Sequence, residues 1–179
     1  RYIGDWSSDV CSSDLRRNAE KAGVTGKATF VQGDLFEADL SKANVITMFL
    51  LPSINMRLRP TLLDLKPGTR IASNTFDMED WEADETRNAG GGCTSWCTAL
   101  LWIVPAKVQG TWQTPQGDLV LTQRFQMLSG TLGGAPITSG RMRGTEMSLL
   151  VNGKTYIATL SGAGMTGTGP DGAFTATRK

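Results

Sequence analysis

The chain has 179 residues, of which 18 are Lys or Arg and 17 are Asp or Glu, so its net charge at pH 7 is +1. This balance gives no electrostatic case for a nucleic-acid partner or an anionic membrane surface. The sequence contains no His, which excludes imidazole as a general base or metal ligand within these residues.

The chain also lacks the sequence signs of membrane insertion or secretion. No apolar run reaches the ~18 residues that suggest a membrane span, and the polar start does not have the apolar core of a secretory signal. We therefore expect a cytoplasmic protein.

Residues 5–15 read as a translated sequencing adapter. Their sequence, DWSSDVCSSDL, is what a short-read adapter encodes in one reading frame, and a match of this length has little chance of arising by accident. Such segments are set aside before the fold is considered. We interpret residues 1–15, including Trp6, as an artefactual and disordered leader, and Arg16 as the start of genuine coding sequence. A real polar leader is the alternative.

Between residues 16 and 107, apolar strand-like runs alternate with helical patterns. Residues 16–22 are the end of a helix that Gly23 closes, and residues 53–65 form a second helix with Ser53 as a candidate N-cap. Continuous apolar runs fit the strands of a parallel sheet that is covered on both faces, and they occupy residues 28–32, 44–51, 69–74 and 100–104. This alternation predicts an α/β fold with right-handed crossovers.

The strand predicted over residues 100–104 departs from that pattern. No clear helix lies between Asp77 and Gly92, and the Gly-rich end of this stretch is typical of a hairpin turn, so the strand is expected to run antiparallel to its neighbour. The same stretch is acidic. We interpret it as a solvated loop, with attraction of a basic substrate as the alternative; its carboxylates are Asp77, Glu79, Asp80, Glu82, Asp84 and Glu85.

Residues 108–179 consist of short segments of alternating polarity separated by Gly-containing turns. Asn152 and Gly153 form a strong hairpin signal, because both tolerate the positive φ angles of a type I′ turn. Regular spacing of this kind predicts an antiparallel meander that closes into a small barrel or sandwich. The whole chain is therefore expected to be α/β followed by all-β.

Two sets of side chains suggest ligand sites but have simpler explanations. Without His or further Cys, Cys93 and Cys97 cannot complete a four-ligand zinc site, so no metal site is predicted and we interpret them as two small thiols near a buried strand. Several tryptophans could form a cage for a methylated amine, although core packing is the favoured interpretation; they are Trp81, Trp96, Trp102 and Trp112.

Three motifs follow one another at compatible spacing before residue 105. The first is Phe-Val-Gln-Gly-Asp-Leu-Phe at residues 30–36, the second is the apolar run at residues 44–52, and the third is Leu-Lys-Pro-Gly-Thr-Arg-Ile at residues 65–71. In this order they resemble the second half of a class I S-adenosylmethionine-dependent methyltransferase. The resemblance covers residues 16 to about 105 and implies a partial Rossmann-like sheet.

The resemblance implies S-adenosylmethionine as cofactor and places three residues beside its adenine. Asp34 would accept a hydrogen bond from the adenine amino group, while Leu35 or Phe36 would pack on the ring. This agrees with the general rule that ligands of open α/β sheets bind at the carboxyl ends of the strands. The alternative is that Asp34 only caps a following helical turn.

A closer resemblance concerns the methyl acceptor. Residues 34–41, running into a strand that ends in Leu-Leu-Pro, are similar to the protein-lysine methyltransferases related to the mitochondrial ATP-synthase c-subunit enzyme. This implies a protein lysine as the partner, entering past Pro52, Ser53 and Asn55 at the edge of the pocket. The alternative is that Pro52 and Ser53 merely start a helix.

The resemblance also implies parts that should precede Arg16. These are the glycine-rich loop that cradles the methionine portion of the cofactor and the acidic residue that holds its ribose. We therefore expect a methyltransferase fragment that binds the cofactor weakly or not at all. The second hypothesis is that residues 108–179 form a non-enzymatic binding or substrate-recruiting module, for which residues 16–107 are only the scaffold.

Overall fold

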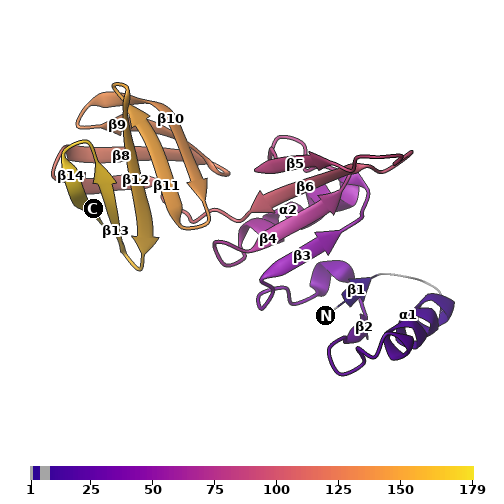
Figure 1. Cartoon of the computed structure of the whole chain (residues 1–179). Helices are drawn as coiled ribbons and strands as arrows, with labels where there is room; N and C mark the ends of the chain where they lie inside the picture. The colour runs from indigo at the N-terminus through magenta and orange to yellow at the C-terminus, as the bar shows by residue number, and fades with distance from the viewer. Residues whose placement is uncertain (1, 5–8) are drawn as a thin grey trace. The chain divides into compact units, whose positions relative to one another are not determined.

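The structure is a computed structural model that describes residues 2–4 and 9–179. The chain divides into two compact units, Arg1–Lys42 and Ala43–Lys179, and Figure 1 labels most of their helices and strands. Trp6 of the expected leader lies outside the described residues. Within the described ranges, no helix has both the length and the apolar character needed to cross a membrane.

The first unit holds a two-stranded parallel sheet of β1 (Tyr2–Gly4) and β2 (Phe30–Gln32), the helix α1 (Asp9–Lys21) and the short 3-10 helix η1 (Leu35–Glu37). The predicted helix end is confirmed. Gly23 has a φ of 65°, and its N–H donates to Glu20 O while Val24 N–H donates to Ala19 O, which is the Schellman pattern of a glycine-terminated helix.

The start of this unit differs from the disordered leader expected over residues 1–15. Residues 2–4 pair with β2, and α1 begins at Asp9, so the helix whose end was predicted at residues 16–22 extends back into the expected leader. No Gly or Pro interrupts residues 9–21, so the helical pattern of the later residues can continue toward the N-terminus. An ion pair of 3.2 Å between Arg17 and Asp14, one turn apart, spans the expected boundary.

The second unit begins with a four-stranded mixed sheet in the order β3-β4-β6-β5. Its strands are β3 (Val45–Met48), β4 (Arg70–Asn74), β5 (Glu85–Asn88) and β6 (Thr98–Ile103). β3 and β4 are parallel and are joined through α2 (Pro52–Leu63), whereas β6 runs antiparallel to β4 and forms a hairpin with β5. The predicted antiparallel strand and its hairpin are therefore confirmed (Figure 1).

The helix α2 starts one residue earlier than predicted. Pro52 occupies its first turn, and Leu51 stands at the N-cap position without a side-chain cap. Ser53 is thus inside the helix, and its prediction as N-cap was wrong, because the fixed φ of proline favours the first helical position. The helix buries Leu58 and Leu62.

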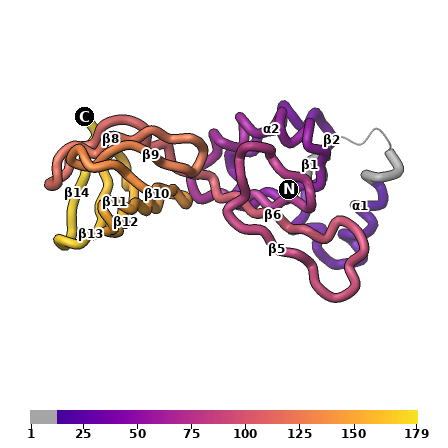
Figure 2. Tube along the Cα trace, turned by 90° about the horizontal axis from the view of Figure 1, so that it is seen from above, coloured from indigo at the N-terminus to yellow at the C-terminus, as the bar shows by residue number. Residues whose placement is uncertain are grey.

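The remaining strands form a closed eight-stranded antiparallel barrel, which follows β6 after one connecting segment (Figure 2). Asn152 and Gly153 have φ angles of 51° and 72°, as predicted for a type I′ turn. The strands are β7 (Gly110–Thr114), β8 (Gly117–Arg124), β9 (Met127–Leu132), β10 (Ala135–Arg143), β11 (Glu146–Val151), β12 (Lys154–Ser161), β13 (Gly164–Gly169) and β14 (Gly172–Arg178).

The barrel has its own apolar core, which includes Trp112, Met142 and Met165. One glycine of the barrel, Gly130, lies where two neighbouring strand backbones approach closely. At Gly130 the φ is 134°, and a Cβ atom would lie 1.9 Å from Val120 O. Only glycine fits such an approach between neighbouring backbones.

Candidate functional site

The candidate site lies at the carboxyl ends of the parallel strands β3 and β4. Phe49 directly follows β3, and the segment 75–77 directly follows β4. The first turn of α2 begins at the same edge, because Pro52 comes only four residues after the last residue of β3. Of the predicted pocket-edge residues in this turn, Pro52 and Ser53 are exposed, whereas Asn55 is fully buried.

Asn55 fixes the loop after β4. Its Nδ2 atom donates to Phe76 O at 3.3 Å and to Asp77 O at 3.0 Å. Its Oδ1 atom is buried and accepts no hydrogen bond from the described residues. The structure therefore gives Asn55 a role in positioning this loop, which its predicted place at the pocket edge did not specify.

The loop reverses sharply at Thr75. This residue has a φ of 65°, which is rare for a β-branched side chain. The turn is closed by a 2.7 Å hydrogen bond from Phe76 N–H to Asn74 O, and Ser73 Oγ donates to Phe76 O at 2.6 Å. Unfavourable backbone angles of this kind persist where the surroundings enforce them, and they gather at functional sites.

Three aromatic rings meet beside this turn, and we call them the aromatic cluster: Phe49, Phe76 and Trp96. Their centroids are 5.7 Å apart for Phe49 and Phe76, 5.6 Å for Phe49 and Trp96, and 5.3 Å for Phe76 and Trp96. Phe49 and Trp96 are exposed, at 55% and 54%. The cluster joins residues from the ends of two strands with one from the β5–β6 hairpin.

Trp96 lies inside a small covalent ring. Cys93 and Cys97 form a disulfide with a Cα–Cα distance of 5.8 Å, so the interpretation of these residues as two small thiols was wrong. The sequence could have signalled this, since closing a loop of so few residues needs only a turn. The other described tryptophans do not form a cage, because Trp81, Trp102 and Trp112 are buried in cores.

In the first unit, the predicted adenine-binding residues are the N-cap and the first two residues of η1. Asp34 is its N-cap, and the side chain accepts a 2.8 Å hydrogen bond from Phe36 N–H. Asp34 is exposed, while Leu35 and Phe36 are half-buried. The capping role is the alternative that the sequence left open for Asp34, and its contact with adenine stays a prediction.

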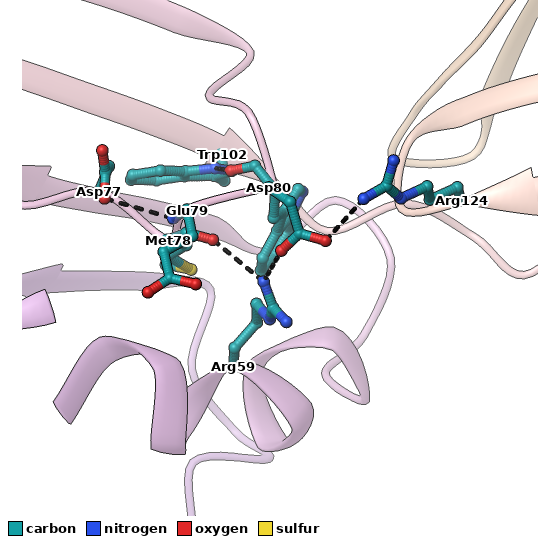
Figure 3. Close-up of polar contacts among 8 residues, drawn as sticks. Arg59, Asp77, Met78, Glu79, Asp80, Trp102 and Arg124 are labelled. Carbon is teal, nitrogen blue, oxygen red and sulfur yellow. Dashed lines mark hydrogen bonds and ion pairs between the residues drawn. The ribbon is translucent and has the colours of Figure 1, made fainter. Parts of the chain in front are cut away.

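The acidic stretch 77–85 is more than a solvated loop. Asp80 accepts a hydrogen bond from Arg124 of the barrel at 2.8 Å and is also paired with Arg59 of α2 (Figure 3). Hydrogen bonds from Arg59 and then Arg124 hold the pKa of Asp80 below its ordinary value. This carboxylate thus links the loop to the helix and to the barrel.

Asp84 makes a second link of this kind. Its side chain is 3% exposed, and it accepts hydrogen bonds from Arg141 Nη2 and from Ile103 N–H, both at 2.7 Å. Glu85 pairs similarly with Arg143. The interpretation of these carboxylates as solvated was therefore wrong, because barrel arginines neutralise them.

Apolar and neutral contacts complete this junction between the loop and the barrel. Phe125, in the β8–β9 turn, stacks on Trp81 with a centroid distance of 6.0 Å, and buried Gln126 donates from Nε2 to Glu82 O at 2.7 Å. Trp81 O in turn accepts from Trp102 Nε1 at 2.7 Å. Sequence reasoning missed Phe125 and Gln126, since neither belongs to a motif.

A protein-family model and a solved structure match parts of this chain. Residues 6–85 match the model of the ANTKMT methyltransferase domain. The crystal structure of an RNA methyltransferase from Salinibacter ruber in complex with S-adenosyl-L-homocysteine is similar to this chain, with 40% identity and a TM-score of 0.52. The similarity covers 60% of this chain and 68% of that one. The chain belongs to the methyltransferase family.

A curated relative is similar to this chain over about half of its length. The protein-lysine N-methyltransferase of Saccharolobus islandicus (strain REY15A) is 51% identical over 86 residues, which amount to 48% of this chain and 53% of that protein. The chain therefore spans about half the length of the curated relative that it matches. The predicted methyltransferase family and the predicted α/β part followed by a barrel are both confirmed.

Proposed function

We propose that this chain is the acceptor-side part of an S-adenosylmethionine-dependent protein-lysine N-methyltransferase. The observation that carries the proposal is the 51% identity to a protein-lysine N-methyltransferase. The bound S-adenosyl-L-homocysteine of the Salinibacter ruber relative supports the choice of cofactor. The exposed carboxylates of Asp77 and Glu79 favour a cationic acceptor over a nucleic acid.

The proposed roles follow from the chemistry of methyl transfer. The cofactor supplies an activated sulfonium methyl group, so the protein mainly has to bind and align the two reactants. Asp34 would accept a hydrogen bond from the adenine amino group, and Leu35 and Phe36 would pack against the ring. Pro52 and Ser53, exposed at the start of α2, would line the entrance for the lysine, and Asn55 would keep the neighbouring loop in place.

We further propose that the glycine-rich loop and the ribose-binding acidic residue belong to sequence outside this chain. The support is that the matched segment amounts to 53% of the curated relative, and that neither motif is recognisable in residues 16–179. On this proposal, the chain alone binds the cofactor weakly or not at all, because half of the cofactor pocket is missing.

Calorimetric titration with S-adenosyl-L-homocysteine tests this proposal on the chain extended by its natural upstream reading frame. Asp34→Asn keeps an oxygen that can cap η1 but replaces the second acceptor by an amide donor. We expect affinity to fall by about 1–2 kcal/mol, or roughly 5- to 30-fold. Asp39→Asn is the matched control, since Asp39 accepts hydrogen bonds from the N–H and Oγ of Ser41 and is not one of the residues proposed to bind adenine.

Two results would count against the proposal. Unchanged affinity in Asp34→Asn would remove this residue from the cofactor site. Failure of the extended protein to bind S-adenosyl-L-homocysteine, despite an intact upstream frame, would reject the methyltransferase activity itself.

A further inference from the structure

We propose that the aromatic cluster binds the side chain of the acceptor lysine. The inference rests on the proposed function, and it adds a substrate subsite that the sequence motifs do not contain. The site consists of the rings of Phe49, Phe76 and Trp96, with the carboxylates of Asp77 and Glu79 following in the same loop.

The exposure of the cluster is the first argument. Phe49 and Trp96 are more than half exposed, although each contacts the other two rings of the cluster. Single exposed apolar side chains are common, but rings that converge from three separate segments form a contiguous surface, and such surfaces mark binding sites. By comparison, Trp81 in the loop between β4 and β5 and Trp102 in β6 are fully buried.

The position of the cluster is the second argument. Phe49 and Phe76 follow the carboxyl ends of the parallel strands β3 and β4, where ligands of open α/β sheets bind. The exposed Pro52 and Ser53 lie only three and four residues after Phe49 in the chain. A side chain held by the rings would therefore be at the predicted entrance of the pocket.

The cluster is also held in place by bonds that do not involve the rings. Asn55 and Ser73 both donate to Phe76 O, which fixes the backbone that carries this ring. Trp96, with a φ of 58°, is confined by the Cys93–Cys97 disulfide. A binding site gains affinity and precision when its side chains are ordered before the ligand arrives.

Lysine is the ligand that suits this chemistry. Its methylene stem can pack along the rings, and its ammonium group can lie over a ring face. Asp77 and Glu79 are exposed carboxylates of the adjoining loop, where they attract a cation and repel phosphates. Asp80, the next residue, already pairs with Arg59 and Arg124. The attraction for the lysine ammonium group would therefore come from Asp77 and Glu79.

The test uses the 179-residue chain and a lysine-containing peptide, titrated by calorimetry and by tryptophan fluorescence. The comparison ligands are the same peptide with norleucine in place of lysine, and a single-stranded RNA oligonucleotide. Phe49→Ala removes an exposed ring without opening a core. Ile157→Ala is the control, because Ile157 is 46% exposed on the barrel. Trp96→Phe keeps a ring and identifies the part of the fluorescence change that comes from Trp96.

We expect the lysine peptide to bind more tightly than the norleucine peptide and to change the emission of Trp96. Phe49→Ala should weaken its binding about three- to tenfold, while Ile157→Ala leaves it unchanged. Trp96→Phe should abolish the fluorescence change. Equal peptide affinities in Phe49→Ala and Ile157→Ala, or tighter binding of RNA than of the lysine peptide, would overturn the inference.

Failure of this inference can be distinguished from failure of the proposed function. Cofactor binding is measured separately with S-adenosyl-L-homocysteine and depends on Asp34. A protein that binds S-adenosyl-L-homocysteine but shows no Phe49-dependent peptide binding would retain the proposed activity and lose only this lysine site.

Discussion

Asp84 offers the sharpest test of how the sheet and the barrel are joined. The perturbation is Asp84→Ala, which removes a carboxylate that is 3% exposed and accepts one hydrogen bond from Ile103 N–H in the sheet and one from Arg141 in the barrel. Asp84 N–H also donates to Leu101 O at 2.8 Å, so the backbone remains held while the side-chain contacts are lost.

The magnitude follows from those two contacts. Leaving the N–H of Ile103 without its acceptor costs about 1–3 kcal/mol. The bond to Arg141 adds less than a fully buried ion pair would, because Arg141 is 40% exposed and can be rehydrated. We therefore expect Asp84→Ala to lower the free energy of unfolding by about 2–4 kcal/mol, and Asp84→Asn to lower it by less, since its amide oxygen can still accept one hydrogen bond.

Urea unfolding monitored by circular dichroism measures this loss, and thermal unfolding should show a Tm lower by about 5–12 °C. The control is Asp118→Ala. Asp118 pairs with Lys179, but its side chain is 49% exposed, so its removal should change stability by at most about 1 kcal/mol. If Asp84→Ala and Asp118→Ala were equally stable, the junction would not be a stabilising element and the reasoning would be refuted.

Three further predictions concern other residues. Because the pKa of Asp80 is lowered in the folded protein, its ion pairs stabilise the fold at pH values above the ordinary aspartate pKa of about 3.9, and this stabilisation is lost as the pH falls through the lower folded pKa. The difference in stability between the wild type and Asp80→Asn should therefore shrink as the pH falls below about 3.9. A constant difference down to pH 2 would contradict this. Gly130→Ala should destabilise the protein by more than about 4 kcal/mol or prevent folding, because the new Cβ atom would lie 1.9 Å from a backbone oxygen. The control Gly153→Ala places its Cβ atom in open space and should cost only about 1 kcal/mol. Equal soluble yields and urea midpoints for the two variants would argue against the close strand contact at Gly130. Asn55→Ala should lower the free energy of unfolding in urea by about 1–3 kcal/mol. The control Ser53→Ala changes an exposed residue of the same helix and should stay within about 0.5 kcal/mol of the wild type. Similar urea midpoints for the two variants would show that Asn55 does not hold the loop.

Local sequence signals predicted local structure well. Gly23 ends α1, and Asn152 with Gly153 forms a type I′ turn, because each of these features depends on the conformational freedom of one or two residues. The antiparallel direction of β6 was also predictable, since a strand that follows a short Gly-rich turn cannot return in parallel.

Long-range side-chain pairs were not predictable in the same way. Asp84 and Arg141 are 57 residues apart, and Arg124 is 44 residues from Asp80. Neither pair belongs to a periodic pattern, so only the folded chain shows that the acidic loop meets barrel arginines. For the same reason, the sequence indicated tryptophans as a group but could not separate the exposed Trp96 from the buried Trp81 and Trp102.

The motifs around Asp34 and Pro52 were recognisable in the sequence and predicted the methyltransferase family, which is confirmed. The contacts of these residues with cofactor and substrate stay predictions. The aromatic cluster was not recognisable, because its rings come from segments that no single motif spans. Its assembly depends on the turn at Thr75 and on the disulfide around Trp96, and both are features of the folded backbone.

The most direct test of the central claim is a methyl-transfer measurement. The chain, extended by its natural upstream reading frame, is incubated with isotopically labelled S-adenosylmethionine and offered a lysine-containing protein substrate together with RNA, and the products are analysed by mass spectrometry. We predict that the label appears on the Nε atom of lysine and that transfer falls in the Phe49→Ala variant. Label in the RNA, or none in either acceptor, would contradict the assignment of a protein-lysine methyltransferase.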